Sequence, residues 1–427
     1  TGDTWTDGFR VMHEQLPEST FTIVGGSAAS EFPIYAIVVI VIMNIIGIVL
    51  TPHFIVTGGG SAKSEHDARV GLVTGNFIKR FCTIGWVITA LIVLTLYGSD
   101  AALIKDADMA WGVATKELLG PLGIGLVGLM LACLLAALMS SVDCYMLVCS
   151  ALVVRNIYVP YLNPGAGEQD CLRLGRIAGG VVVLGAVVIS VTMLDMFKQL
   201  ELTWIVPMTF AALFWLGMYW RRATTRAGWI TIVFCLLTFF VLPRTIPAVA
   251  PGLRINAAYT QMNQPADSNA AGGKSIYWTG GITDMKGVSR GEGSFRFDMI
   301  IYDKVLGFDL TKVRNATLKT LEFPFKIIAP FLVMIIASLL TKPNSKKALD
   351  RLYVKMKTPV NPDPEQDSRE IDVSYAKPNR FDDRKLFPGT QLEFQRPTAM
   401  DFWGFLVCFA ICFGIIGLVL WVAQIGT

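Results

Sequence analysis

Oxygen-bearing side chains interrupt the longest apolar run of the chain. Within the run 119–154, Ser140, Ser141 and Asp143 lie close together among Leu, Ala, Met and Val residues. Hydroxyl and carboxylate oxygens are hard ligands that suit an alkali cation. A carboxylate in the middle of a membrane-spanning run is costly, and such residues usually have a function. This stretch therefore predicts a cation site.

Helical spacing would gather most of these groups on one face. Ala137, Ser140, Ser141 and Cys144 stand at positions i, i+3, i+4 and i+7, and Asp143 follows Ser140 by three residues. The alternative interpretation is that both serine hydroxyls bond back to carbonyls one turn earlier, which is common in membrane helices. The carboxylate in the same turn favours the ion site over this alternative.

Polar residues at the ends of other apolar runs leave their roles open. Lys79 and Arg80 precede the run 81–97, where anchoring at the membrane interface is the more common role for a basic side chain. Gln199 lies at the start of the run 202–220 and belongs either to its outer end or to a transport pathway. None of the three histidines stands in a pattern with a nucleophile, so the sequence predicts no enzyme.

Long apolar runs separated by charged loops must position these residues. Hydrophobic residues make up 53% of the chain and charged residues 16%, whereas a soluble domain is about a quarter charged. Since a span needs about 20 apolar residues, the sequence predicts an all-α transmembrane protein with about eight transmembrane helices. The expected spans are 33–56, 81–97, 119–154, 177–193, 202–220, 227–242, 323–340 and 402–422. The Gly- and Pro-rich beginning of the third run is expected to precede the membrane helix.

Basic residues in the short loops predict the orientation in the membrane. If the first span runs inward, the short inside segments carry Lys63, Arg69, Lys79, Arg80, Arg155, Arg173, Arg221, Arg222 and Arg226, and the outside segments carry Lys105, Lys116 and Lys198. This asymmetry fits the positive-inside rule. The net charge of +4 is carried by loops, so no nucleic-acid partner is expected.

The same orientation predicts six segments. They are an extracellular loop 1–32, a core of five spans 33–245, an extracellular insert 246–322, a peripheral helix 323–341, a cytoplasmic loop 342–400 and a C-terminal helix 401–427. Within the cytoplasmic loop, the Pro- and acid-rich stretch 359–384 is expected to be extended.

Ordered motifs along residues 33–245 resemble the sodium:solute symporter family. The sequence AALMSSVD at 136–143, followed by SALVVRNIY at 150–158, resembles the eighth core helix of that family. TPHFIV at 51–56 resembles the end of the sixth, and SEHDARVG at 64–71 with FIKR at 77–80 resembles the approach to the seventh. LRLGRIA at 172–178 resembles the start of the ninth, and 207–224 resembles the tenth.

The resemblance implies a fold similar to that of the leucine transporter, with two inverted repeats around a midplane site. By this match, the first five spans are core helices six to ten, and the remaining spans are peripheral. The first repeat would then be supplied elsewhere, either in the same protein or by a separate chain. The chain begins at Thr1, which favours a truncated sequence.

The resemblance also implies roles for individual residues. The Ala137 carbonyl and the Ser140 and Ser141 hydroxyls match the main sodium (metal) site of the family. Asp143 and Cys144 fall where some members place serines for a second sodium ion, so a carboxylate there is a departure.

Two further residues match solute contacts of the sugar transporters in this family. Lys79 matches a substrate-contacting lysine, and Gln199 lies within one residue of a sugar-binding glutamine. The aromatic gate pair of those members would fall at Gly47 and Ile48, which argues against assuming a sugar.

Together these features predict sodium-coupled symport of a small organic solute. The protein would be a multi-pass protein of the cell membrane, with the lipid bilayer, the solute and the first repeat as its partners. An alternative is a non-transporting signalling or scaffold subunit derived from a symporter. The presence of Ser140, Ser141 and Asp143 argues against that alternative, because these are the residues expected to bind the ion.

Overall fold

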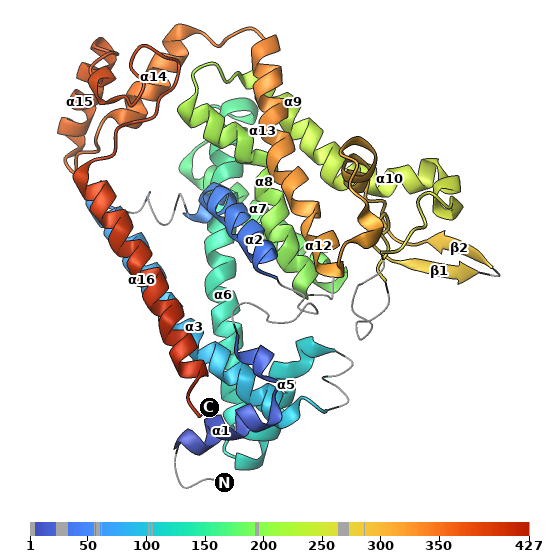
Figure 1. Ribbon diagram of the computed structural model, residues 1–427. Helices are drawn as coiled ribbons and strands as arrows, with labels where there is room; N and C mark the ends of the chain where they lie inside the picture. The colour runs from blue at the N-terminus through green and yellow to red at the C-terminus, as the bar shows by residue number, and fades with distance from the viewer. Residues whose placement is uncertain are drawn as a thin grey trace. The chain divides into compact units, whose positions relative to one another are not determined.

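The protein is described by a computed structural model that covers residues 5–22, 33–54, 56, 60, 62–100, 103, 106–192, 196–263, 273–285 and 287–426 (Figure 1). Within these residues, 7 helices are long and apolar enough to cross a membrane, and a shorter apolar helix covers Ile34–Leu50. Strands are confined to one short hairpin in the described part of the chain. The predicted all-α transmembrane class is therefore confirmed.

The chain divides into two compact units. The first contains Thr1–Pro17, Thr51–Thr203 and Ala410–Thr427, and the second contains Glu18–Leu50 and Trp204–Phe409. Each unit is described by itself.

The first unit is built mainly from three long helices. These are α3 (Glu65–Tyr97), α6 (Leu126–Val153) and α7 (Glu168–Thr192), and the shorter α1 (Trp5–Gln15) and α5 (Ala110–Ala114) pack against α3. A π-helical segment, Val154–Leu162, continues α6. Gly123 and Gly125 adopt left-handed φ angles of 64° and 80° immediately before α6. The Gly- and Pro-rich beginning of the run 119–154 therefore lies outside the long helix, as predicted.

Two helices begin in polar sequence before the apolar runs that predict them. Helix α3 begins at Glu65, well before residue 81, because the Ser64 hydroxyl accepts the Asp67 N–H at 3.1 Å. Helix α7 likewise begins at Glu168 and not near residue 177. Hydropathy marks the part of a helix that can lie in lipid, whereas capping decides where the helix begins.

The first apolar helix ends earlier than predicted. Helix α2 covers Ile34–Gly47, and a 3₁₀ turn, Ile48–Leu50, follows it. The chain bends at Thr51, and residues 52–54 and 56 are helical again. Pro52 has no N–H group and its ring clashes with the preceding turn, so it interrupts the regular helix here. Some predicted features lie outside the described residues. They are Gly58 and Gly59 in the loop after the first span, Lys105, and parts of the predicted loop 1–32.

The second unit packs four apolar helices together. Helix α13 (Glu322–Leu340) contacts α2 and α9 (Thr225–Leu236), while the greater part of α8 (Met196–Tyr219) contributes Met208, Ala211 and Ala212 to the buried core. Close approach depends on small residues. A Cβ atom added at Gly47 would lie 2.7 Å from Met208 Cε, and one added at Gly228 would lie 2.3 Å from Leu213 Cδ1.

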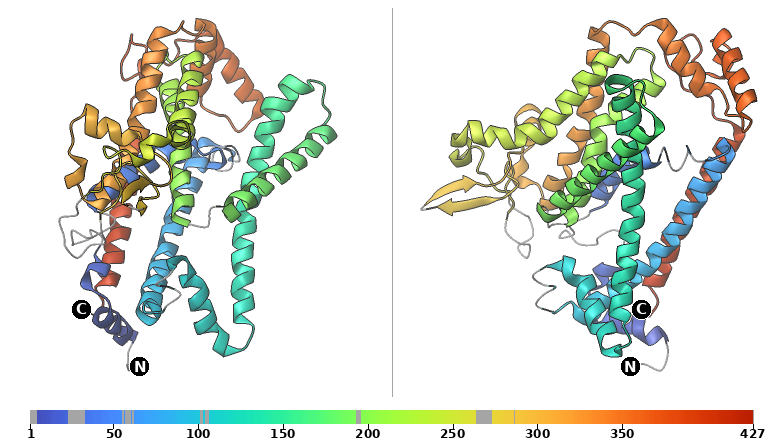
Figure 2. Two further views of the ribbon diagram at one scale, coloured as in Figure 1. Left: turned by 90° about the vertical axis from the view of Figure 1, so that its right-hand side faces the viewer. Right: turned by 180° about the vertical axis from the view of Figure 1, so that it is seen from behind.

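The insert 246–322 has a hydrophobic core of its own. Tyr277, Trp278, Phe295 and Met299 are among its buried side chains. The antiparallel hairpin of β1 (Ile282–Met285) and β2 (Val288–Gly291) extends from this core, as Figure 2 shows. The short helices α10 (Leu242–Val249), α11 (Asp298–Ile300) and α12 (Asn315–Thr320) complete the region.

The polar segment after α13 is helical where an extended chain is expected. It contains α14 (Lys346–Lys357) and α15 (Pro364–Ala376), and α16 (Ala399–Ala423) follows it. The expectation for 359–384 is wrong because Asp363 caps α15 and accepts the Glu365 N–H at 3.1 Å, while Pro364 occupies the first turn, where proline is tolerated.

Candidate functional site

Helix α6 carries the predicted cation ligands in one regular helical stretch. The Ser141 hydroxyl donates to the Ala137 carbonyl at 3.3 Å, and no side-chain partner is recorded for Ser140 among the described residues. The back-bonding interpretation therefore holds for one serine only. Because the Ser141 hydroxyl points its proton at Ala137, the oxygen lone pairs remain available to a cation.

Helix geometry separates Asp143 from part of this group. At roughly 100° per residue, Asp143 lies about 60° from Ser140 and about 160° from Ser141 around the helix axis. Residues two apart on a helix do not face each other. Asp143 and Ser140 can therefore bind the same cation. Asp143 does not belong to the face that Ala137, Ser141 and Cys144 form.

The other side of α6 is occupied by α7. A Cβ atom added at Gly179 would lie 2.5 Å from Met146 Cγ and 3.1 Å from Ser150 Oγ, and one added at Gly175 would lie 3.8 Å from Ser150 Cβ. Two glycines four residues apart let two membrane helices approach closely. This contact fixes which face of α6 is turned away from α7.

The candidate ligands on α6 are uncovered in this chain. Ala137, Ser140, Ser141 and Asp143 are exposed and Cys144 is half-buried. Asp143 lies about 60° around the helix axis from Met146, on the side that α7 contacts farther along α6, whereas Ala137, Ser141 and Cys144 lie on the opposite side. Neither a hydrogen bond nor an ion pair is recorded for the Asp143 carboxylate among the described residues. Since unpaired polar groups at membrane depth face a bundle interior or a water-filled path, these groups require a covering element.

One neighbour of the site is not evident from the sequence. The His53 ring lies 4.5 Å from the Tyr145 ring in an edge-on contact, two residues beyond Asp143. The segment that follows α2 therefore packs on α6 next to the candidate ion ligands. No periodicity links residues so far apart in the sequence, so only the tertiary structure could show this contact.

The two predicted solute contacts lie on other helices. Lys79 is exposed on α3, and its carbonyl accepts the Thr83 hydroxyl at 3.3 Å. Gln199 is half-buried in the first turn of α8. Helix α3 packs against α1 and α5.

Membrane-length helices and an oxygen-lined face on α6 are features of a multi-pass membrane transporter. The model of the sodium:solute symporter family matches residues 17–233, which include α3, α6 and α7. The chain therefore belongs to the sodium:solute symporter family, whose members are transporters and not enzymes.

Characterised relatives match parts of the chain. The osmoregulated proline transporter OpuE of Bacillus subtilis is 28% identical over 144 residues, which are 33% of this chain and 28% of that protein. The sodium/glucose cotransporter of Vibrio parahaemolyticus is 27% identical over 191 residues, 40% of this chain and 34% of that protein. The sodium/mannose cotransporter SLC5A10 of Bos taurus is 27% identical over 199 residues, 42% of this chain and 32% of that protein.

The chain thus spans about a third of the length of the curated relatives that it matches. No solved structure matches it closely.

Proposed function

We propose that this chain forms one wall of a sodium-coupled symporter that moves a small organic solute across the cell membrane. The observation that carries the proposal is the uncovered oxygen face of α6 inside the family-matched region. The first repeat, in the same protein or in a partner chain, would supply the opposite wall. Such a partner would also cover the polar groups that α7 leaves exposed.

Sodium would bind at the Ala137 carbonyl and the Ser140 and Ser141 hydroxyls. Together these groups offer hard oxygen ligands within two helical turns. Moving one positive charge inward across 100 mV releases about 2.3 kcal/mol, so one sodium ion supplies useful coupling before its concentration gradient is counted.

Asp143 and Cys144 extend the same turn of α6. The carboxylate lies on the side of Ser140, where it would balance the charge of a cation held there or accept a proton that is carried with the solute. This placement supports one ion at the Ser140 side of the face, with Asp143 as its counter-charge.

Lys79 and Gln199 are the proposed solute contacts on this chain. The relatives are named for proline, glucose and mannose transport, so the class of solute is a small organic molecule. An aromatic gate at Gly47 would not fit, because a Cβ atom there already lies 2.7 Å from Met208 Cε.

Ser140→Ala and Asp143→Asn test the ion site in the complete transporter. Loss of one hydroxyl ligand should cost on the order of 1–2 kcal/mol, which is about a tenfold rise in the sodium concentration for half-maximal uptake. Asp143→Asn should raise it at least as much or change its pH dependence. The measurement is solute uptake against sodium concentration at two pH values, normalised to protein amount.

Ser150→Ala is the matched control. Ser150 lies on the same helix and donates to the Met146 carbonyl at 2.6 Å on the side that faces α7. Its replacement should leave the sodium dependence unchanged. Unchanged sodium dependence in Ser140→Ala and Asp143→Asn would mean that α6 holds no ion.

A further inference from the structure

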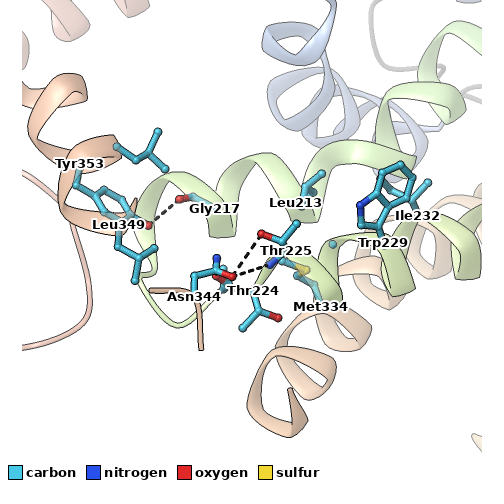
Figure 3. A pocket seen from close by; sticks show the side chains of 13 residues that line it. Leu213, Gly217, Thr224, Thr225, Trp229, Ile232, Met334, Asn344, Leu349 and Tyr353 are labelled. Atoms are coloured by element: carbon cyan, nitrogen blue, oxygen red, sulfur yellow. Dashed lines mark hydrogen bonds between the residues drawn. The ribbon is translucent and has the colours of Figure 1, made fainter. Parts of the chain in front are cut away.

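A cavity in the second unit lies apart from the proposed ion face. It has a volume of about 300 Å³ and lies between α8, α9, α13 and α14 (Figure 3). Its walls are mainly apolar, with large contributions from Leu213, Trp229, Ile232, Met334 and Tyr353. The size is at the lower end for ligand pockets, and the lining suits a hydrocarbon chain.

One edge of the cavity is polar. Thr224, Thr225 and Asn344 line it together. Asn344 Oδ1 accepts from the Thr225 N–H and hydroxyl, both at 3.4 Å, and Asn344 Nδ2 donates to the Ala223 carbonyl at 3.3 Å. Bonds of this length are weak, so Thr225 and Asn344 retain capacity for a polar ligand, whereas the Thr224 hydroxyl bonds with Thr341 at 2.6 Å.

Three cations stand beside the polar edge. Arg226 follows Thr225 on α9, and Lys346 and Lys347 open α14 shortly after Asn344. All three side chains belong to exposed residues, and none forms an ion pair within the described part of the chain. An apolar interior thus lies next to three cations, each within two residues in the sequence of a residue that lines the cavity.

Two membrane-length helical stretches end beside the cavity. The stretch Thr225–Val249 begins with α9, and the stretch Asn315–Leu340 ends with α13. Trp229, one turn inside Arg226, is 66% exposed, and tryptophan favours the bilayer interface. Exposed Leu352 and Met356 on basic α14 complete an interfacial pattern.

We propose that this cavity binds one anionic phospholipid of the inner leaflet. An acyl chain would lie between α8, α9 and α13, and the phosphate would lie at Arg226, Lys346 and Lys347. Charge complementarity selects the ligand, because the three unpaired cations favour a headgroup with net negative charge over a zwitterionic one. The positive-inside asymmetry places these cations on the cytoplasmic side.

The test compares two lipids on the full chain. The protein is purified in mild detergent and mixed with equal amounts of phosphatidylglycerol and phosphatidylcholine, and bound lipid is counted by native mass spectrometry. The intact chain should retain phosphatidylglycerol in preference. The double variant Lys346→Gln/Lys347→Gln should weaken that binding by about tenfold or more.

A matched pair separates a site from general surface charge. Lys355→Gln/Lys377→Gln removes the same charge from exposed positions farther along the segment and should change binding by less than about twofold. Ile232→Trp should fill the cavity and expel the lipid while the cations remain.

Three outcomes would overturn the proposal. They are equal retention of the two lipids, an equal loss in both lysine pairs, or unchanged binding in Ile232→Trp. None of these measurements depends on solute transport, so the lipid site stands or falls separately from the symport function.

Discussion

At the scale of single residues, buried charges outside the apolar helices carry the sharpest consequences. Glu393 is 3% exposed and is surrounded by cations, since Arg221 and Lys357 both contact its carboxylate and Lys385 Nζ lies 3.1 Å away. Asp350 also pairs with Arg221 at 2.6 Å. The cluster fastens the stretch around Glu393 to the end of α8.

Glu393→Gln should release that stretch from α8. Removing the carboxylate leaves the buried Lys357 without its partner, whereas Arg221 keeps Asp350 and Lys385 keeps Asp382, and the loss costs about 3–5 kcal/mol. Hydrogen exchange over residues 385–396 should accelerate strongly in the variant. Glu370→Gln, which breaks an exposed pair with Arg380, should leave that exchange unchanged. Equal exchange in the two variants would contradict the fastening role.

A second buried carboxylate, that of Asp298, makes the stability of the insert depend on pH. Burial first, and then repulsion from Glu322, raise the pKa of Asp298 from 3.8 to about 6, although Lys326 and Arg296 oppose the rise. Since the folded state holds the proton more tightly, this group's contribution to stability is present below about pH 4 and is lost as the pH rises to about 6.

Asp298→Asn should therefore stabilise the insert at pH 7.5 by on the order of 2–3 kcal/mol and have little effect at pH 4. Thermal unfolding at both pH values, with hydrogen exchange over residues 276–302, measures the difference. Asp372→Asn on the exposed face of α15 is the control and should show no such difference. Destabilisation at pH 7.5 would mean that the ionised carboxylate is paired with Lys326 or Arg296.

At the scale of helices, the contact of α6 with α7 depends on one glycine. Gly179→Ala should destabilise the helix pair by about 1–3 kcal/mol, because the added methyl group meets Met146 and Ser150. Gly180→Ala is the matched control, since nothing lies within 4 Å of its added Cβ atom. It should stabilise α7 by about 0.5–1 kcal/mol through helix propensity alone. Denaturation of the purified chain in detergent compares the two, and effects of the same sign would contradict this contact.

At the scale of the whole molecule, the uncovered face of α6 sets what this chain can do. An ion site with one wall leaves the cation mostly hydrated, and a solute site with one wall binds weakly. We expect the chain alone in liposomes to show no solute-dependent sodium uptake. Addition of a first repeat from the same protein or from a partner chain should restore it. Measurable coupled uptake by the chain alone would contradict the two-wall proposal.

Sequence by itself determined the membrane class and the approximate spans, and it predicts the α6 ligand set. These features are local, because the length of an apolar run and the spacing of Ser140 and Ser141 depend only on nearby residues. Hydropathy left the beginnings of α3 and α7 undetermined, because both helices begin in polar sequence, and for α3 the Ser64 cap sets the first residue.

Tertiary structure alone decided how those local elements meet. The packing of Gly179 against Met146 turned the face of Ala137, Ser141 and Cys144 away from α7. The approach of His53 to Tyr145, the ions around Glu393 and the cavity between α8, α9, α13 and α14 join residues far apart in the chain. Such contacts form where helices find complementary shape and charge, and no local pattern of residue types encodes that match.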